Sequence, residues 1–403
     1  MDSLNQPRHM TPYLPEESIE WQQICTEFII STAKLQESIH PNLRKALAPL
    51  LEMMNCYYSN LIEGHRTYPV EIARAINKTS ESKDEKALVL EALAHIHTQR
   101  EITQKMANDD FEPSDEKWIR WMHSCFVGQL PEELRIVKSA HAEKTLIIKP
   151  GDLRDGPVIV GNHVAPEHTS LNTLLTCFRE QYGGISDSSP HSLARLAAAH
   201  HRFTWIHPFY DGNGRVARLI TDSMLDRAGA GCQGLWRIAR GFARTVEEYK
   251  RLLASADSNR QGALDGHGNL SQQALNMWCF YVIQTALDQV KFMYSLINPA
   301  ELSERIKRWA AQSFKKTNQD RIGLLLAMIT RNGFIDRKTA TLILGVTGRQ
   351  SRNIIEDLAY RGLIVSAPRE DLKPVVSIRM APHWFPGLFP AEEEEWMRRA
   401  ENV

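Results

Sequence analysis

The sequence predicts a mainly α-helical protein with a short β-hairpin and a C-terminal winged-helix (helix-turn-helix) domain. Apolar residues recur at helical spacing through most of the chain, as Trp21, Phe28 and Leu35 do within the run 18–39. Gly and Pro residues separate and follow two β-prone segments within 145–166, which interrupts the helical pattern. After about residue 300, helices alternate with turns and end in two β-prone runs.

Length and composition limit the classes of protein that fit. The 403 residues are too many for one small core, so two or three domains are expected. Apolar residues make up 43% and charged residues 24%, as is typical of a soluble globular protein. The 48 basic and 48 acidic residues cancel, so no global field attracts nucleic acid or a membrane. The longest aliphatic run, 322–329, is too short to span a bilayer, and we expect no membrane partner.

The cysteines and the first residues predict a cytoplasmic location. The six cysteines are scattered without a CxxC pair, which argues against a zinc site or disulfide framework and fits a reducing compartment. Residues 1–18 contain no basic patch followed by an apolar run, so they do not have the pattern of a secretory signal.

The alternation of helical runs and breaks predicts four regions. Further helical runs are expected at 85–102, 115–130, 170–181, 189–206, 215–229 and 271–297. The regions are an N-terminal helical region (1–110), a core (111–297), the winged-helix domain (300–385) and an acidic tail (386–403). Within the core, Thr145–Ile148 and Val158–Val160 are β-prone and predict a hairpin at about 145–166.

The C-terminal region has the pattern of a helix-turn-helix. Between 301 and 379 there are 15 Lys and Arg against 8 Asp and Glu, so the region is locally basic. Apolar residues and a turn glycine lie where such a unit packs on itself: Leu342, Leu344, Gly345, Ile354, Ile355 and Leu358. The two β-prone runs that follow would form a wing.

Phosphate-binding chemistry is concentrated in the stretch "TWIHPFYDGNGRVARLI", residues 204–220. Gly212, Asn213 and Gly214 precede a helix, where unpaired backbone N–H groups and the helix dipole favour an anion such as phosphate. Arg215 and Arg218 lie three positions apart, so they project from one face of that helix and can grip phosphates.

The same stretch supplies a carboxylate and a base. Asp211 offers a hard oxygen of the kind that holds Mg2+ together with substrate phosphates. His207 is suited to take a proton from an attacking hydroxyl near neutral pH. The set predicts phosphoryl or nucleotidyl transfer. A metal-hydrolase site with His200 and His201 as further ligands is a weaker alternative, because adjacent side chains diverge by about 100° on a helix.

The segment HPFYDGNGRVAR, residues 207–218, matches the signature HPFx[DE]GNGRxxR at every fixed position. On this motif the chain resembles the Fic-domain (protein adenylyltransferase) family, over roughly residues 50–300. The segment 151–166 resembles the flap of that family, which pairs with the target protein and presents its hydroxyl group. The expected flap residues are Val158, Ile159, Val160 and Gly161.

The resemblance implies a Fic-type helical bundle that transfers AMP from ATP to a Ser, Thr or Tyr hydroxyl of a protein. It implies that His207 is the general base and that Asp211 is the Mg2+ ligand. Asn213 and the neighbouring glycine backbone would hold the α-phosphate, and the two arginines would orient the β- and γ-phosphates. Phe209 would anchor the loop in the core.

A second motif, "SNLIEG" at 59–64, resembles the inhibitory-helix pattern [ST]xxxE[GN] of the family. Ser59 and Glu63 lie four positions apart and share one face of a helix expected around 53–64, which Gly64 would end. A glutamate at this site would pair with Arg218 and permit only an unproductive pose of ATP. The alternative reading is an exposed glutamate near a helix end.

The third helix of the winged-helix domain and its wing carry residue types that contact phosphates and base edges. They are Arg349, Gln350, Arg352 and Asn353 on the helix, and Arg369 and Lys373 on the wing. A protein partner fits a winged helix equally well. Three functions therefore stay open: a self-inhibited AMP transferase, a DNA-binding regulator whose Fic domain only senses nucleotide, and a phosphodiesterase that removes AMP. A homodimer is compatible with the sequence, which does not decide the oligomeric state.

Overall fold

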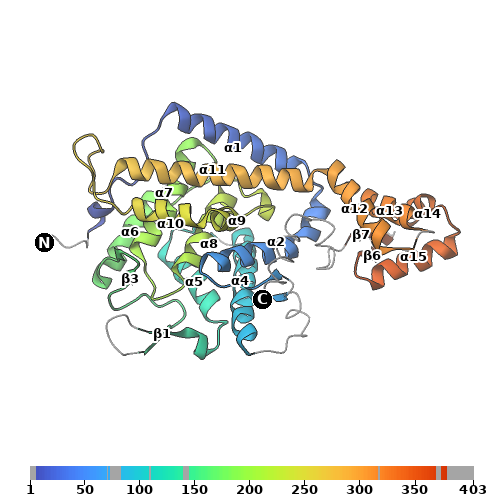
Figure 1. The fold of residues 1–403 in the computed structure, drawn as a ribbon, viewed down its shortest axis with the longest axis horizontal. Helices are drawn as coiled ribbons and strands as arrows, with labels where there is room; N and C mark the ends of the chain where they lie inside the picture. The colour runs from blue at the N-terminus through green and yellow to red at the C-terminus, as the bar shows by residue number, and fades with distance from the viewer. Residues whose placement is uncertain are drawn as a thin grey trace. The chain divides into compact units, whose positions relative to one another are not determined.

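The computed structural model describes residues 6–69, 71–72, 83–108, 110–138, 145–315, 318–368 and 374–378 (Figure 1). The chain divides into two compact units. Unit 1 is Met1–Thr32 with Met53–Gln289, and unit 2 is Ala33–Glu52 with Val290–Val403. The predicted N-terminal region, 1–110, is thus divided between the units, and the predicted acidic tail lies outside the described residues.

Helices make up most of the described chain, as the sequence predicts. Those lying wholly or partly in unit 1 are α1 (Ile19–Glu37), α2 (Pro41–Ile62), α4 (Lys83–Asn108), α5 (Glu116–Val127), α6 (Leu171–Tyr182), α7 (Pro190–Ile206), α8 (Asn213–Arg227), α9 (Ala239–Arg244), α10 (Val246–Ser255) and α11 (Gln272–Ile297). Short 3-10 helices are η1 (Pro7–Met10), η2 (Glu132–Arg135), η3 (His168–Ser170) and η4 (Cys232–Gly234). None of the described helices has the length and apolar character needed to cross a membrane.

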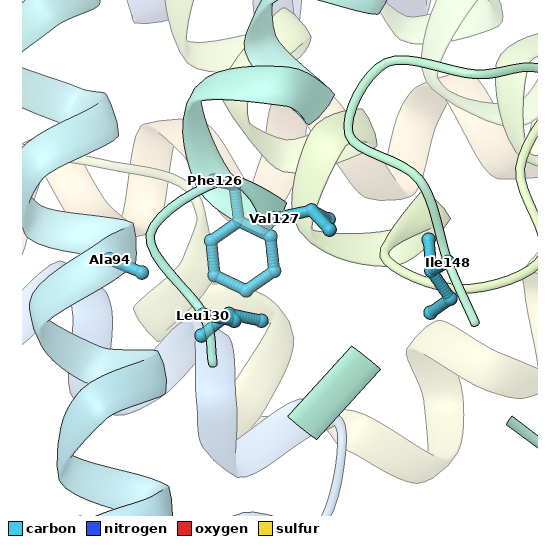
Figure 2. Packing of buried hydrophobic residues seen from close by; sticks show 5 residues of the cluster. All are labelled: Ala94, Phe126, Val127, Leu130 and Ile148. Carbon is cyan, nitrogen blue, oxygen red and sulfur yellow. The ribbon is translucent and has the colours of Figure 1, made fainter. Parts of the chain in front are cut away.

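Helix α7 lies in the middle of unit 1 and ends at the candidate site. Nearly all of its residues are buried, since other elements of the unit surround it. Trp278 of α11 donates a hydrogen bond from Nε1 to the carbonyl of Ala197 at 2.8 Å, which ties the two helices together. A smaller cluster joins α4 and α5 to the segment after β2 (Figure 2); it contains Ala94, Phe126, Val127, Leu130 and Ile148.

Two short hairpins occupy the region where one was expected. Strand β1 (Ile136–Lys138) pairs antiparallel with β2 (Thr145–Ile147), and β3 (Ile159–Val160) pairs with β4 (His163–Val164). The prediction that Thr145–Ile148 and Val158–Val160 form one hairpin is therefore wrong. The residues between them bond elsewhere: Arg154 N donates to Pro208 O at 2.9 Å, and a β-ladder cannot use the same group.

Unit 2 contains the C-terminal helices and a three-stranded sheet. The elements are α12 (Pro299–Ser313), α13 (Gln319–Asn332), β5 (Ile335–Asp336), α14 (Arg337–Leu344), α15 (Gly348–Tyr360), β6 (Ile364–Pro368) and β7 (Pro374–Ile378). The strand order is β5-β7-β6, all antiparallel. The helix–turn–helix pair α14 and α15 followed by two paired strands has the predicted element order, and its assignment as a winged helix stays a prediction.

Two details of unit 2 differ from expectation. Leu342 is 73% exposed, whereas Leu344 is buried. Positions two apart on a helix point about 200° apart, so only one of them can face the core. Gln350 accepts a hydrogen bond from Thr347 N at 3.1 Å in the capping box that starts α15. The wing positions Arg369 and Lys373 lie outside the described residues.

We predict that Phe126→Ala destabilises the protein by about 3–5 kcal/mol, because it removes a buried ring from the cluster in Figure 2 and leaves a cavity. Chemical denaturation measures the loss. The matched control is Ile136→Ala, which truncates a side chain that is 46% exposed and should change stability by no more than about 0.5 kcal/mol. Equal losses in the two variants would contradict the assignment of the core.

Candidate active site

The loop between α7 and α8 carries the predicted base. Helix α7 ends at His207, whose backbone is left-handed (φ 48°, ψ 63°), and α8 begins after Gly212, which is left-handed as well (φ 80°). Asn213 closes the loop, because its Nδ2 donates to Phe209 O at 2.8 Å and its Oδ1 accepts from Phe209 N at 3.0 Å. Phe209 is fully buried and stacks on His123 with ring centroids 3.8 Å apart. Asn213 and the buried ring of Phe209 thus fix the conformation of the loop.

His207 has the tautomer and the protonation state that the predicted base requires. Its Nδ1 lies 3.3 Å from Thr204 O, and a carbonyl can only accept, so Nδ1 carries the proton and Nε2 keeps a free lone pair. Burial lowers the pKa of His207 to about 4, and the hydrogen bond to Thr204 opposes this shift. The imidazole is therefore neutral at pH 7.

The N-terminus of α8 lies where the sequence predicts an anion cradle. Within the described residues, no side chain caps this helix, and its first turn contains Gly214. Asp211 Oδ1 accepts a hydrogen bond from Gly212 N at 2.6 Å, and the Asp211 side chain is about half exposed. Unpaired N–H groups and the helix dipole at such an end attract an anion.

Arg218 is buried on α8 and is bound by the end of α2. Its Nε donates to Ser59 Oγ at 2.9 Å, and its Nη2 donates to Ser59 O at 3.1 Å and to Glu63 Oε1 at 2.6 Å. Gly64, left-handed with φ 88°, ends the helix directly after Glu63. Ser59 and Glu63 of the "SNLIEG" motif thus both bind Arg218, the last arginine of the loop motif.

The Glu63 carboxylate also covers the start of α8. A Cβ atom at Gly214 would overlap Glu63 Oε1, so the close approach depends on a glycine at this position. A carboxylate here lies against the helix end that attracts anions. Glu63 Oε1 therefore lies at the end of α8 where the sequence predicts a phosphate.

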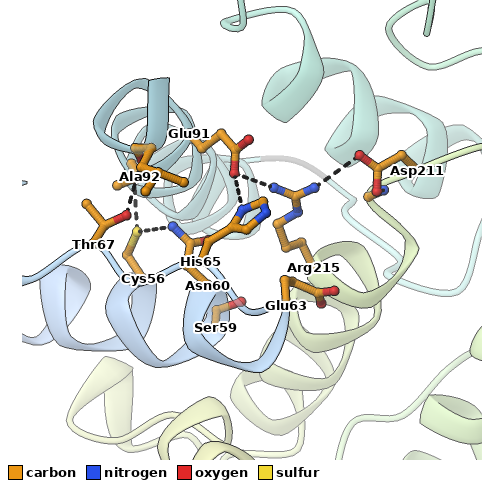
Figure 3. A network of polar contacts seen from close by, with 12 residues as sticks. Cys56, Ser59, Asn60, Glu63, His65, Thr67, Glu91, Ala92, Asp211 and Arg215 are labelled. Carbon is orange, nitrogen blue, oxygen red and sulfur yellow. Dashed lines mark hydrogen bonds and ion pairs between the residues drawn. The ribbon is translucent and has the colours of Figure 1, made fainter. Parts of the chain in front are cut away.

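Arg215 is bound by carboxylates on both sides (Figure 3). Its Nη1 donates to Glu91 Oε2 at 3.1 Å, and its Nη2 donates to Asp211 Oδ2 at 3.4 Å. His65, which follows the "SNLIEG" segment, lies with Nδ1 2.7 Å from the same Glu91 oxygen. The Arg215 guanidinium lies over the Phe126 ring at 4.5 Å, so the hydrophobic cluster supports it from below.

The loop motif lies within a segment that is similar to known proteins. Residues 113–225 match the family model of the Fic/DOC family. This segment is a Fic domain. A protein named protein adenylyltransferase Fic from Drosophila willistoni is 40% identical over 114 residues, which are 28% of this chain and 23% of that protein. The protein of the same name from Drosophila virilis is 32% identical over 114 residues, 28% of this chain and 24% of its own.

The chain thus spans about a quarter of the length of these relatives. A solved structure of Fic-1 (residues 134–508) from C. elegans superposes with a TM-score of 0.52 at 16% sequence identity. The superposition covers 70% of this chain and 74% of the C. elegans chain. It supports the fold of the Fic domain and of the segments that pack around it.

The predicted flap positions lie at the hairpin β3–β4. Ile159 and Val160 are 43% and 47% exposed, and Gly161 makes the turn with φ 59°. Val158 O accepts a hydrogen bond from Ala165 N at 3.1 Å, which closes the base of the hairpin. The aliphatic side chains of this two-residue strand are thus close to half exposed.

His200 and His201 have partners of their own, away from the loop motif. His200 is buried between Thr221 Oγ1 at 2.7 Å and Tyr249 OH at 3.0 Å, and His201 Nε2 lies 2.8 Å from Asp257. In the described part of the chain, no cluster of three or more His, Cys, Asp or Glu side chains is arranged to hold a metal. Among the residues that the structure describes, the metal-hydrolase alternative thus has no ligand set.

Sequence reasoning missed several residues of the site. Glu91 lies 124 positions before Arg215, and His65 directly follows the "SNLIEG" motif without being part of it. Arg154 and His123, which hold the loop, were not singled out. Each is a single polar residue in an ordinary helix or loop, and its position in the sequence has no spacing that marks a partner. Asn213 was expected to hold a phosphate, but its side chain is engaged with Phe209.

Glu63 and Glu91 stay ionised near neutral pH. Burial alone would raise the pKa of Glu63, but Arg218 and Arg215 outweigh it and lower this pKa below its usual value. For Glu91, burial is likewise outweighed by the hydrogen bond from His65 and by Arg215. The hydrogen bond to Glu91 raises the pKa of His65 above its usual value.

We predict that the His65–Glu91 pair stabilises the protein more at pH 6 than at pH 8.5. The folded-state pKa of His65 is raised, so its contribution is complete below about pH 6.5 and is lost as the pH rises through the folded-state value. The melting temperature of wild type should exceed that of His65→Gln by about 1–2 °C at pH 6, because a partly exposed pair contributes under about 1 kcal/mol. The difference should shrink at pH 8.5; a difference that grows would contradict the assignment.

Proposed function

We propose that this chain is a self-inhibited protein adenylyltransferase, which transfers AMP from ATP to a Ser, Thr or Tyr hydroxyl of a target protein. The observation that carries the proposal is the arrangement of one loop. A neutral His207 lies at its start, and an uncapped helix N-terminus with Arg215 and Arg218 lies at its end. Relatives that share the Fic domain bear the name of this activity.

The proposed reaction assigns a task to each group. Nε2 of His207 accepts the proton of the target hydroxyl, whose oxygen forms a bond to the α-phosphorus as the bond to the diphosphate breaks. The diphosphate leaves with the bonding electron pair. Backbone N–H groups of residues 213 and 214 stabilise the charge on the α-phosphate oxygens, and the arginines orient the β- and γ-phosphates.

Asp211 is the residue that would hold Mg2+. A single, half-exposed carboxylate at a loop tip fits this ion, which takes its other ligands from water and substrate phosphates. When bound, the ion neutralises charge on the diphosphate. The free cysteines, most of them buried, fit a cytoplasmic setting.

Inhibition in this proposal comes from competition for Arg218. The γ-phosphate and the Glu63 carboxylate require the same guanidinium and the same space at Gly214. While Glu63 is in place, ATP binds only in a pose that does not present its α-phosphate to His207. The target protein would dock along the exposed edge of the flap, where backbone pairing supplies affinity.

We predict that Glu63→Gly raises AMP labelling of protein by about 10- to 100-fold, because it removes a charge-assisted hydrogen bond of about 1.5–3 kcal/mol from Arg218. Incubation with labelled ATP measures the transfer. Adding His207→Ala to the same variant should abolish the labelling. Arg66→Gly, an exposed change in the same segment, is the matched control and should label like wild type.

The outcomes separate the three functions. Equal labelling by wild type and Glu63→Gly contradicts inhibition by this glutamate. Nucleotide binding without transfer in any variant supports the nucleotide-sensing regulator. Release of AMP from a modified protein, dependent on Glu63, supports the phosphodiesterase.

A DNA contact by unit 2 is a separate proposal. Arg349 and Arg352 are exposed on the first turns of α15, where a recognition helix meets phosphates and base edges. We predict that unit 2 binds DNA and that salt weakens this binding. In Arg349→Ala/Arg352→Ala the plot of log affinity against log salt concentration should become shallower, its slope smaller in magnitude by about 2. Binding that is absent at low salt, or unchanged in the double variant, would favour a protein partner.

A further inference from the structure

Arg154 is a buried cation between β2 and β3 with an unusual set of partners. Its side chain is 2% exposed, and the ion pairs of the described residues include none to Arg154. Its donors go to backbone carbonyls instead. Nε donates to His207 O at 2.7 Å, Nη1 donates to Gly156 O at 2.9 Å, and Nη2 donates to Pro166 O and to Ile206 O, the latter at 3.4 Å.

One residue thereby binds three successive carbonyls of the turn that carries the base. The side chain donates hydrogen bonds to the carbonyls of Ile206 and His207. The backbone N–H of Arg154 donates to the carbonyl of Pro208 at 2.9 Å. This turn includes the left-handed backbone of His207, a conformation that a non-glycine residue adopts only where its surroundings enforce it. The hydrogen bonds from Arg154 help to hold His207 in this conformation.

The same guanidinium also holds both ends of the flap. Gly156 precedes β3 and Pro166 follows β4, so the two carbonyls belong to the two stems of the hairpin. A second link runs beside it, because Tyr210 OH donates to Asp155 Oδ1 at 2.6 Å. The flap stems and the loop of His207 are therefore bonded to each other through neighbouring residues.

We propose that Arg154 is a positioning residue, which fixes the flap to the turn of His207 so that a hydroxyl docked on the flap meets the base at one set separation. The inference rests on the proposed transfer reaction. Alignment of nucleophile and base is sensitive to small shifts, and a misplacement of about 1 Å costs about 100-fold in rate. Burial lowers the pKa of Arg154 to about 10, so it stays charged at pH 7.

The charge of Arg154 gives a second, separable consequence. The charged or titratable groups that act on His207 are His163 of β4, Arg154 and Asp211, besides the carbonyl of Thr204. A cation bonded to the backbone of His207 disfavours a second proton on the imidazole. Loss of the charge should therefore raise the pKa of His207, whereas loss of the hydrogen bonds alone should not.

The test compares Arg154→Lys and Arg154→Gln in the full chain carrying Glu63→Gly. Both should lower kcat by about 100-fold and change KM for ATP by less than about 3-fold, because the nucleotide cradle is intact. Imidazole NMR titration should show a higher pKa of His207 in Arg154→Gln and little change in Arg154→Lys. The His207→Ala spectrum assigns the signal.

Arg195→Gln is the matched control, because Arg195 also donates to backbone carbonyls, those of Gln181 and Gly183, but lies 12 residues before His207 on α7. It should leave kcat and the His207 pKa at the parent values. Unchanged kcat in Arg154→Lys, or an equal loss in Arg195→Gln, overturns the proposal. If Arg154→Gln does not fold, Arg154→Lys decides alone. If the parent transfers no AMP, the proposed function fails, while the NMR titration still tests the contact between Arg154 and His207.

Discussion

The guanidinium of Arg218 is the group on which the site depends. It is 2% exposed, and a buried cation that loses its partners destabilises a protein by about 3–5 kcal/mol. The chain supplies those partners from α2, through the hydroxyl and carbonyl of Ser59 and the carboxylate of Glu63. A phosphate that binds Arg218 must therefore replace a partner already present, and this exchange is the physical basis of the proposed inhibition.

Arg215, like Arg218, is paired with carboxylates. Arg215 is balanced by Glu91 and Asp211, and His65 connects Glu91 to the segment that carries Glu63. Arg154 is the exception, since its partners are carbonyls of the flap stems and of the turn at His207. In the proposed function Arg215 and Arg218 bind phosphates, and Arg154 holds the turn of His207 and the flap stems together.

Local patterns in the sequence predicted more than long-range ones did. The loop motif is contiguous, so the base and the arginines could be named, and the "SNLIEG" motif identified a partner 155 positions from Arg218. Glu91 and Arg154 have no such local signal, because only the fold brings them to the loop. The helical class was predicted from periodicity, but the hairpin pairing was wrong, since the chain between the β-prone runs bonds to the loop. The prediction that Leu342 packs in the core was wrong, because two leucines two positions apart on one helix cannot both face a core.

The most direct measurement is a crystal structure of the wild-type protein with a non-hydrolysable ATP analogue, beside that of Glu63→Gly. We predict that in wild type Glu63 keeps its contact with Arg218 and the γ-phosphate lies elsewhere. In Glu63→Gly the γ-phosphate should contact Arg218, with the α-phosphate at the N-terminus of α8. A wild-type structure in which the γ-phosphate binds Arg218 and Glu63 has moved away would contradict it.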